Sequence, residues 1–78
     1  MTTILRMPGV NSRTGDGRST IYKKVSERLF TKPIRFGARS VGWPDYEVEA
    51  IIQARIAGRS DAEIRQLVVE LEAKRRQV

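Results

Sequence analysis

The chain has 78 residues, 40% of them hydrophobic, and contains no Cys and no His. This length suits one small domain, and the missing residue types exclude disulfides, thiolate zinc sites, Cys nucleophiles and histidine general bases. No stretch approaches the ~20 apolar residues of a membrane span, and the first residues have no apolar run of signal-peptide length. We therefore expect a cytoplasmic protein that is not an enzyme, with no catalytic residue, metal, cofactor or small-molecule substrate.

The positive charge is confined to one half of the chain. The net charge is +6, yet residues 1–40 carry nine basic and two acidic side chains, whereas residues 41–78 carry six basic and seven acidic ones. Such segregation is the electrostatic footprint of a surface that binds a polyanion. It predicts double-stranded DNA as the partner. A membrane surface is disfavoured, because no predicted helix pairs a basic face with a large, aromatic-rich apolar face.

Two helices are predicted in the basic half. Pro8 suits the first turn of a short helix over residues 7–14. A second helix is predicted over residues 18–29, because apolar residues recur there at i, i+4 and i+8. That apolar stripe consists of Ile21, Val25 and Leu29. Small polar and basic side chains lie around the other side, so we expect this helix to bury one face and to expose a polar one.

Residues 30–43 predict a small β-hairpin. Ile34, Phe36 and Val41 are strand formers on either side of a turn over residues 37–40, and Pro33 restricts the first strand to a sheet edge. The alternative is an irregular loop anchored by Phe36 and Trp43. Trp43 itself is predicted to lie in the core, where it closes the hairpin onto the next helix.

Two further helices are predicted after the hairpin. The first starts at Pro44 or Asp45 and ends before Gly58, and Glu47 near its start is interpreted as an acid that stabilises the helix dipole. The last helix is predicted to start with a capping box, which Ser60 forms with Glu63 three residues later. Its apolar stripe consists of Ile64, Leu67, Val68 and Leu71. This stripe needs a cover, either the domain itself or the same helix of a second chain, and it is the candidate surface for dimerisation or partner docking.

The order of helix, glycine turn, polar-faced basic helix, hairpin and helix is a winged helix-turn-helix layout. The sequence also resembles the AlpA family of phage regulatory proteins, most specifically in Arg-Ser-Thr-Ile-Tyr at residues 18–22 and Arg-Ser-Val-Gly-Trp at residues 39–43. The resemblance covers residues 4–57. It implies a mostly α-helical winged helix-turn-helix domain, which we assign to residues 1–58. The amphipathic helix over residues 59–78 lies outside the family pattern and is predicted from its capping box and apolar stripe alone. Asp16 and Gly17 depart from the family, which usually has an apolar residue and then a Ser or Thr cap there; either residue here can still cap the second helix.

The predicted DNA-binding side chains lie on the second helix and on the hairpin. They are Arg18, Ser19, Thr20, Tyr22, Lys23, Lys24, Arg35 and Arg39. An α-helix fits the major groove with its N-terminal residues nearest the base edges. Arg18 suits either a guanine or a phosphate, Lys23 and Lys24 suit phosphates, and Tyr22 suits a phosphate or the core. The hairpin arginines suit the flanking backbone or a narrow minor groove.

Three functions remain open at this stage. The resemblance implies a DNA-binding transcriptional regulator of a prophage or integrative element, which we favour. The alternative that the resemblance also implies is an excisionase that bends attachment-site DNA. The third possibility belongs to a different class of protein: an adaptor whose last helix docks RNA polymerase or a recombinase such as an integrase. Assembly into a homo-oligomer on DNA is compatible with all three.

Overall fold

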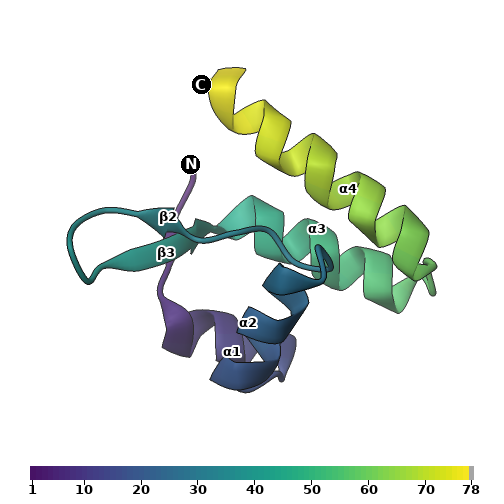
Figure 1. Cartoon of the computed structure of the whole chain (residues 1–78), viewed down its shortest axis with the longest axis horizontal. Coiled ribbons are helices and arrows are strands. Elements are labelled where there is room, and N and C mark those ends of the chain that lie inside the picture. Colours follow the sequence, from purple (N-terminus) through teal and green to yellow (C-terminus); the bar gives the residue numbers. More distant parts are fainter. Residues whose placement is uncertain (78) are drawn as a thin grey trace.

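The computed structural model describes residues 1–77, within which the chain forms four α-helices, three short strands and a 3-10 turn (Figure 1). They are β1 (Ile4–Leu5), α1 (Met7–Thr14), α2 (Arg18–Ser26), β2 (Ile34–Arg35), β3 (Val41–Pro44), α3 (Asp45–Ile56), α4 (Asp61–Lys74) and η1 (Arg75–Gln77). The predicted first helix and the two predicted after the hairpin are confirmed. Within residues 1–77 no helix is long and apolar enough to cross a membrane.

Helix α2 ends earlier than its apolar periodicity predicts. The prediction extended it to Leu29, but the helix stops at Ser26 because Arg28 adopts the left-handed conformation, with φ of +62°. The backbone N–H of Arg28 donates to the carbonyl of Val25 at 3.1 Å, and that of Leu29 donates to the carbonyl of Lys24 at 2.8 Å. These two bonds form a Schellman motif, which normally places glycine at the left-handed position. The chain has arginine there, so its sequence carries no stop signal.

The hairpin is confirmed, and it belongs to a slightly larger sheet. The strand order is β1-β3-β2 and both pairings are antiparallel, so β2 lies at an edge, as Pro33 predicts. Strand β1, with Ile4 opposite Pro44, was not predicted. Gly42 permits this close pairing, because a Cβ there would lie 2.6 Å from Ile4 Cγ2 and 3.0 Å from the Leu5 carbonyl oxygen.

The core lies where the helices meet the base of the hairpin. Trp43 is fully buried, as predicted; its indole N–H donates to the carbonyl of Thr31 at 2.7 Å, and its ring lies edge-on to Phe30 at 5.8 Å. The buried apolar residues are Val10, Ile21, Phe30, Trp43, Val48, Ile51, Ile64, Val68 and Leu71. Every helix contributes to this list, so one small core holds α1, α2, α3 and α4 together.

Helix α4 lies along α3 and is fastened to the rest of the chain by polar contacts at its C-terminal end (Figure 1). The side chain of Glu47 is completely buried, and both of its oxygens accept hydrogen bonds from Arg75, at 2.8 Å and 2.6 Å. Arg75 also donates to the carbonyl of Lys32 at 2.7 Å. The dipole interpretation of Glu47 was therefore incomplete, because its main partner lies 28 residues further along the chain.

Candidate nucleic-acid interface

Helix α2 presents a polar face at its N-terminal end. Arg18, Ser19, Thr20 and Lys23 are exposed, whereas Ile21 is fully buried. The helix begins after Gly17, and no side chain of residues 1–77 caps its first turn. Uncapped N–H groups at a helix start attract anions such as phosphate. Arg18, Ser19 and Thr20 thus surround a positively polarised helix end, and Lys23 lies further along, in the last turn of α2.

Tyr22 borders both this face and the core. Its side chain is 37% exposed, and its ring centroid lies 6.5 Å from that of Trp43. The guanidinium of Arg18 lies over the Tyr22 ring at 5.9 Å from the centroid, a distance at which a cation–π attraction operates. Tyr22 therefore contacts Arg18 through the face of its ring and lies next to the buried Trp43.

Lys24 differs from its neighbours because an acidic residue engages it. Its ammonium lies 3.0 Å from Asp16 Oδ2, and the guanidinium of Arg55 in α3 reaches the same oxygen at 3.0 Å. Burial raises the pKa of Asp16, but the hydrogen bonds and positive charges of Lys24 and Arg55 outweigh it, so the pKa lies below its ordinary value of 3.8. Lys24, which was predicted to bind DNA, is thus held in an ion pair within the protein.

The hairpin carries the two remaining predicted residues. Arg35 and Arg39 are both exposed, and the turn between them is closed by the Phe36 N–H, which donates to the carbonyl of Ser40 at 2.8 Å. Figure 1 shows this turn projecting from the helical body. Phe36 is 52% exposed beside these arginines, so it does not anchor the segment in the core.

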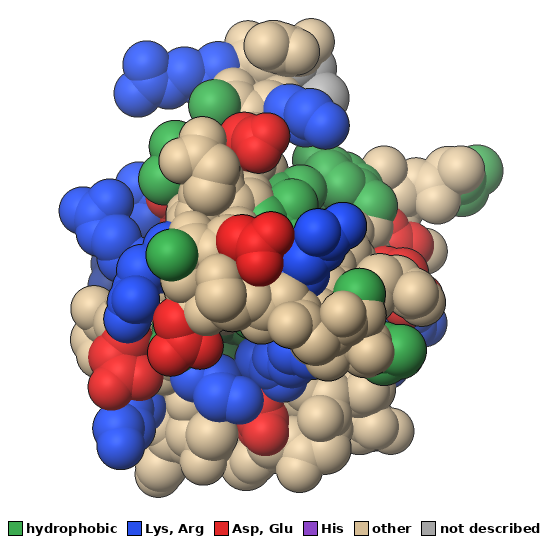
Figure 2. Space-filling model, turned by 90° about the vertical axis from the view of Figure 1, so that its right-hand side faces the viewer, with side chains coloured by type: hydrophobic (Ala, Val, Ile, Leu, Met, Phe, Trp, Pro, Cys, Tyr) green, Lys and Arg blue, Asp and Glu red, His purple; other side chains and the backbone are tan. Residues whose placement is uncertain are grey.

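The apolar stripe of α4 is largely used within the chain itself. Ile64, Val68 and Leu71 are buried in the core, and Leu67 packs against it while partly exposed. The surface of this region is mixed in charge: Figure 2 shows blue basic and red acidic side chains interleaved on the side of the molecule where α3 and α4 meet. This agrees with the near-neutral second half of the sequence.

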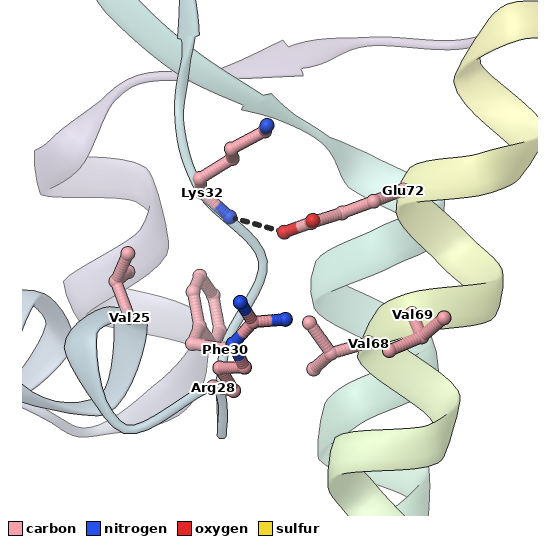
Figure 3. Close-up of a pocket in the computed structure, with 7 residues that line it drawn as sticks. All are labelled: Val25, Arg28, Phe30, Lys32, Val68, Val69 and Glu72. Carbon is pink, nitrogen blue, oxygen red and sulfur yellow. Dashed lines mark hydrogen bonds between the residues drawn. The ribbon is translucent and has the colours of Figure 1, made fainter.

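A hollow of about 300 Å³ separates α4 from the segment that follows α2 (Figure 3). The N–H of Lys32 donates to Glu72 Oε2 across it at 3.0 Å, and the side chain of Arg28 lies between Phe30 and Val68. Arg28 and Lys32 are exposed basic residues that were not predicted to belong to a site. Among residues 1–77 no three acidic side chains come close enough to hold a metal ion.

A two-helix unit followed by a β-hairpin that projects beside it is a winged helix-turn-helix, the fold predicted from the order of the elements. The family described as "Prophage CP4-57 regulatory protein (AlpA)" matches residues 3–56. The chain belongs to this AlpA family, as its sequence indicates.

Two relatives extend this comparison. The chain is 40% identical over 55 residues to the "Uncharacterized protein ORF88" of Enterobacteria phage P4, a match that covers 70% of this chain and 62% of the phage protein. It is 34% identical over 58 residues to the "DNA-binding transcriptional activator AlpA" of Escherichia coli strain K12, covering 67% of this chain and 83% of that protein. No solved structure matches the chain.

Proposed function

We propose that the protein is a cytoplasmic, sequence-specific DNA-binding regulator of transcription in a prophage or integrative element. One observation carries this proposal: α2 buries Ile21 completely while its first turn exposes Arg18, Ser19 and Thr20 at an uncapped helix end. The name of the Escherichia coli relative supports the same class of activity. Residues 1–40, with a net charge of +7, supply the positive field that a DNA partner requires.

In this proposal α2 enters the major groove with its N-terminal turn foremost. Ser19 and Thr20 are short, so they allow the helix backbone to approach the base edges closely. Arg18, supported by the Tyr22 ring, is placed to bond a guanine through O6 and N7. Lys23, exposed one turn further on, contacts a phosphate and contributes affinity without sequence information.

The hairpin acts as the wing in the same proposal. Arg35 and Arg39 are exposed and lie outside the ion pairs of the described residues, so both remain available to the flanking backbone or to a narrow minor groove. These contacts position the domain on the duplex. Bending of the DNA, as an excisionase would require, involves the same fold and the same surfaces. The distribution of binding sites, beside a promoter or repeated at an attachment region, distinguishes the two activities.

Selection of duplexes from a random-sequence pool, followed by affinity measurements at several salt concentrations, tests this proposal. Five to seven phosphate contacts give a plot of log K against log salt with a slope of about −4 to −6. Arg18→Ala or Thr20→Ala is expected to weaken binding to the selected duplex by about 1–3 kcal/mol and to random duplex by less. Arg39→Ala weakens both duplexes alike.

Arg76→Ala is the matched control, because Arg76 is an exposed arginine on η1, far along the chain from α2. It should leave the ratio of selected to random affinity and most of the slope unchanged. A slope near zero for the parent protein would reject DNA binding. An unchanged affinity ratio in both Arg18→Ala and Thr20→Ala would show that α2 does not read the bases.

A further inference from the structure

The turn between α1 and α2 contains a carboxylate that two basic side chains share. Asp16 Oδ2 lies 3.0 Å from Lys24 Nζ and 3.0 Å from Arg55 Nη1, and the Asp16 side chain is only 20% exposed. Lys24 comes from α2 and Arg55 from α3, so one acidic group joins the turn to both helices. Asp16 lies two positions before Arg18, where α2 starts. This end of the helix carries the exposed polar side chains.

We propose that Asp16 is a specificity-determining residue of the DNA interface, because it withholds Lys24 from phosphates and fixes the start of α2 against α3. The inference rests on the proposed DNA-binding function and describes how that surface is controlled. It divides the basic residues of α2 into those available to DNA, Arg18 and Lys23, and one that the protein keeps for itself.

The ion pair is protected enough to compete with DNA for Lys24. The side chains of Lys24 and Asp16 are 28% and 20% exposed, and partly buried charges are screened less by salt than exposed ones. To reach a phosphate, Lys24 would have to leave a hydrogen bond of 3.0 Å to a charged carboxylate. Lys23 has no such partner among the described residues and is fully available.

The charge of Asp16 also affects specific and non-specific binding unequally. Non-specific binding depends almost wholly on attraction to phosphates, whereas specific binding adds contacts to base edges. Base contacts fix the position of α2 in a specific complex, whereas a non-specific complex can shift until a free cation meets a phosphate. A Lys24 released from Asp16 would therefore strengthen non-specific binding more than specific binding. The presence of the Asp16 carboxylate raises the ratio of specific to non-specific affinity, although it lowers the total positive charge.

Arg55 connects the turn to the core of the protein. Its guanidinium lies over the ring of the buried Phe30 at 6.0 Å from the centroid and contacts Asp16 through Nη1. The turn is thereby tied through Arg55 to α3 and to the core. A fixed turn fixes the direction in which the first residues of α2 point, and base contacts require such fixed geometry.

The decisive variant is Asp16→Asn, which keeps the size of the side chain and removes its charge. Glu27→Gln is the matched control, because Glu27 is exposed at the other end of α2 and the charge change is identical. Affinity is measured on random-sequence duplex and on a duplex selected by the parent protein. We expect Asp16→Asn to bind random duplex about five- to tenfold tighter at low salt, with a slope steeper by about one unit, and to lower the selected-to-random ratio.

A second pair of variants tests the inference without disturbing the turn. Lys23→Met is expected to reduce the salt slope by about one unit, whereas Lys24→Met leaves it unchanged. In the Asp16→Asn background, Lys24→Met should then reduce the slope by about one unit. If Lys24→Met lowers the slope of the parent protein as Lys23→Met does, or if Asp16→Asn and Glu27→Gln behave alike, the inference is wrong. A parent protein with no salt dependence would instead reject the DNA-binding function on which it rests.

Discussion

Helices α2 and α4 are both amphipathic in sequence, yet their surfaces are used in opposite ways. Helix α4 is closed by a capping box, buries Ile64, Val68 and Leu71, and is followed by the arginine that binds the buried Glu47. Helix α2 has no side-chain cap among residues 1–77, and its polar first turn faces solvent. Helix α4 therefore contributes stability, whereas α2 is positioned by its neighbours and leaves its polar first turn exposed.

The largest expected effect follows from breaking the ion pair that fastens the end of α4. Arg75→Met leaves the carboxylate of Glu47 buried without its partner, which should lower the free energy of unfolding by about 3 kcal/mol. Urea unfolding followed by circular dichroism measures the change. The double variant with Glu47→Leu should recover most of the loss, because two apolar side chains need no charge compensation. Equal stability of Arg75→Met and the parent would show that the pair does not fasten α4.

Removing the N-cap of α4 and adding one to α2 tests the difference between the two helices more directly. Ser60→Ala removes an oxygen that accepts a hydrogen bond from the Glu63 N–H at 3.2 Å, and it should lower the free energy of unfolding by about 1 kcal/mol. Gly17→Ser adds a cap to α2 and should raise that free energy by a few tenths of a kcal/mol, roughly the Gly-to-Ser cap difference. There is room for it, since among residues 1–77 no atom beyond Gly17 and its two chain neighbours lies within 4 Å of the position that a Cβ at Gly17 would take.

The same Gly17→Ser variant should bind DNA more weakly, because the new hydroxyl accepts the N–H groups that a phosphate would otherwise use. Thermal melting and duplex titration of one protein sample measure both quantities. Tighter duplex binding by this variant would mean that the free helix end has no role in binding.

The smallest expected effect concerns the acid stability of the turn before α2. The pKa of Asp16 is lowered in the folded protein, so its ion pairs stabilise the fold above the ordinary value of 3.8 and lose that contribution as the pH falls through the lowered pKa. Between neutral pH and about pH 2, the parent should therefore lose more stability than Asp16→Asn. Urea midpoints measured at several pH values supply the difference. Parallel curves would show that Asp16 stabilises the fold equally in both protonation states.

Local signals account for the elements that the sequence predicts well. Pro8 marks the start of α1, Gly58 follows the end of α3, and Ser60 with Glu63 marks the start of α4. The period of the apolar residues also predicts which side of α2 is exposed. Each of these signals acts within a few residues, so it can be interpreted without knowledge of the fold.

The features that the sequence does not predict depend on long-range contacts. Strand β1 has two residues and exists because β3 pairs with it, about 40 positions later. Asp16 and Arg55 are separated by 39 positions, and Glu47 and Arg75 by 28. Residue type alone therefore suggests that Lys24 is free and that Glu47 is a surface acid. Only the packing of the helices shows that each has a charged partner.

The fluorescence of Trp43 reports on both the core and helix α2. Trp43 is the single tryptophan of the chain, it is fully shielded from water, and its ring lies 6.5 Å from that of Tyr22 on α2 and 5.8 Å from that of Phe30. Loss of the core moves its emission to longer wavelengths, because water then surrounds the indole. A ligand bound to α2, as proposed, would instead perturb Tyr22 and change the energy that this ring transfers to the indole. One unlabelled sample thus distinguishes, by fluorescence, a variant that has unfolded from one that is folded and has lost its ligand.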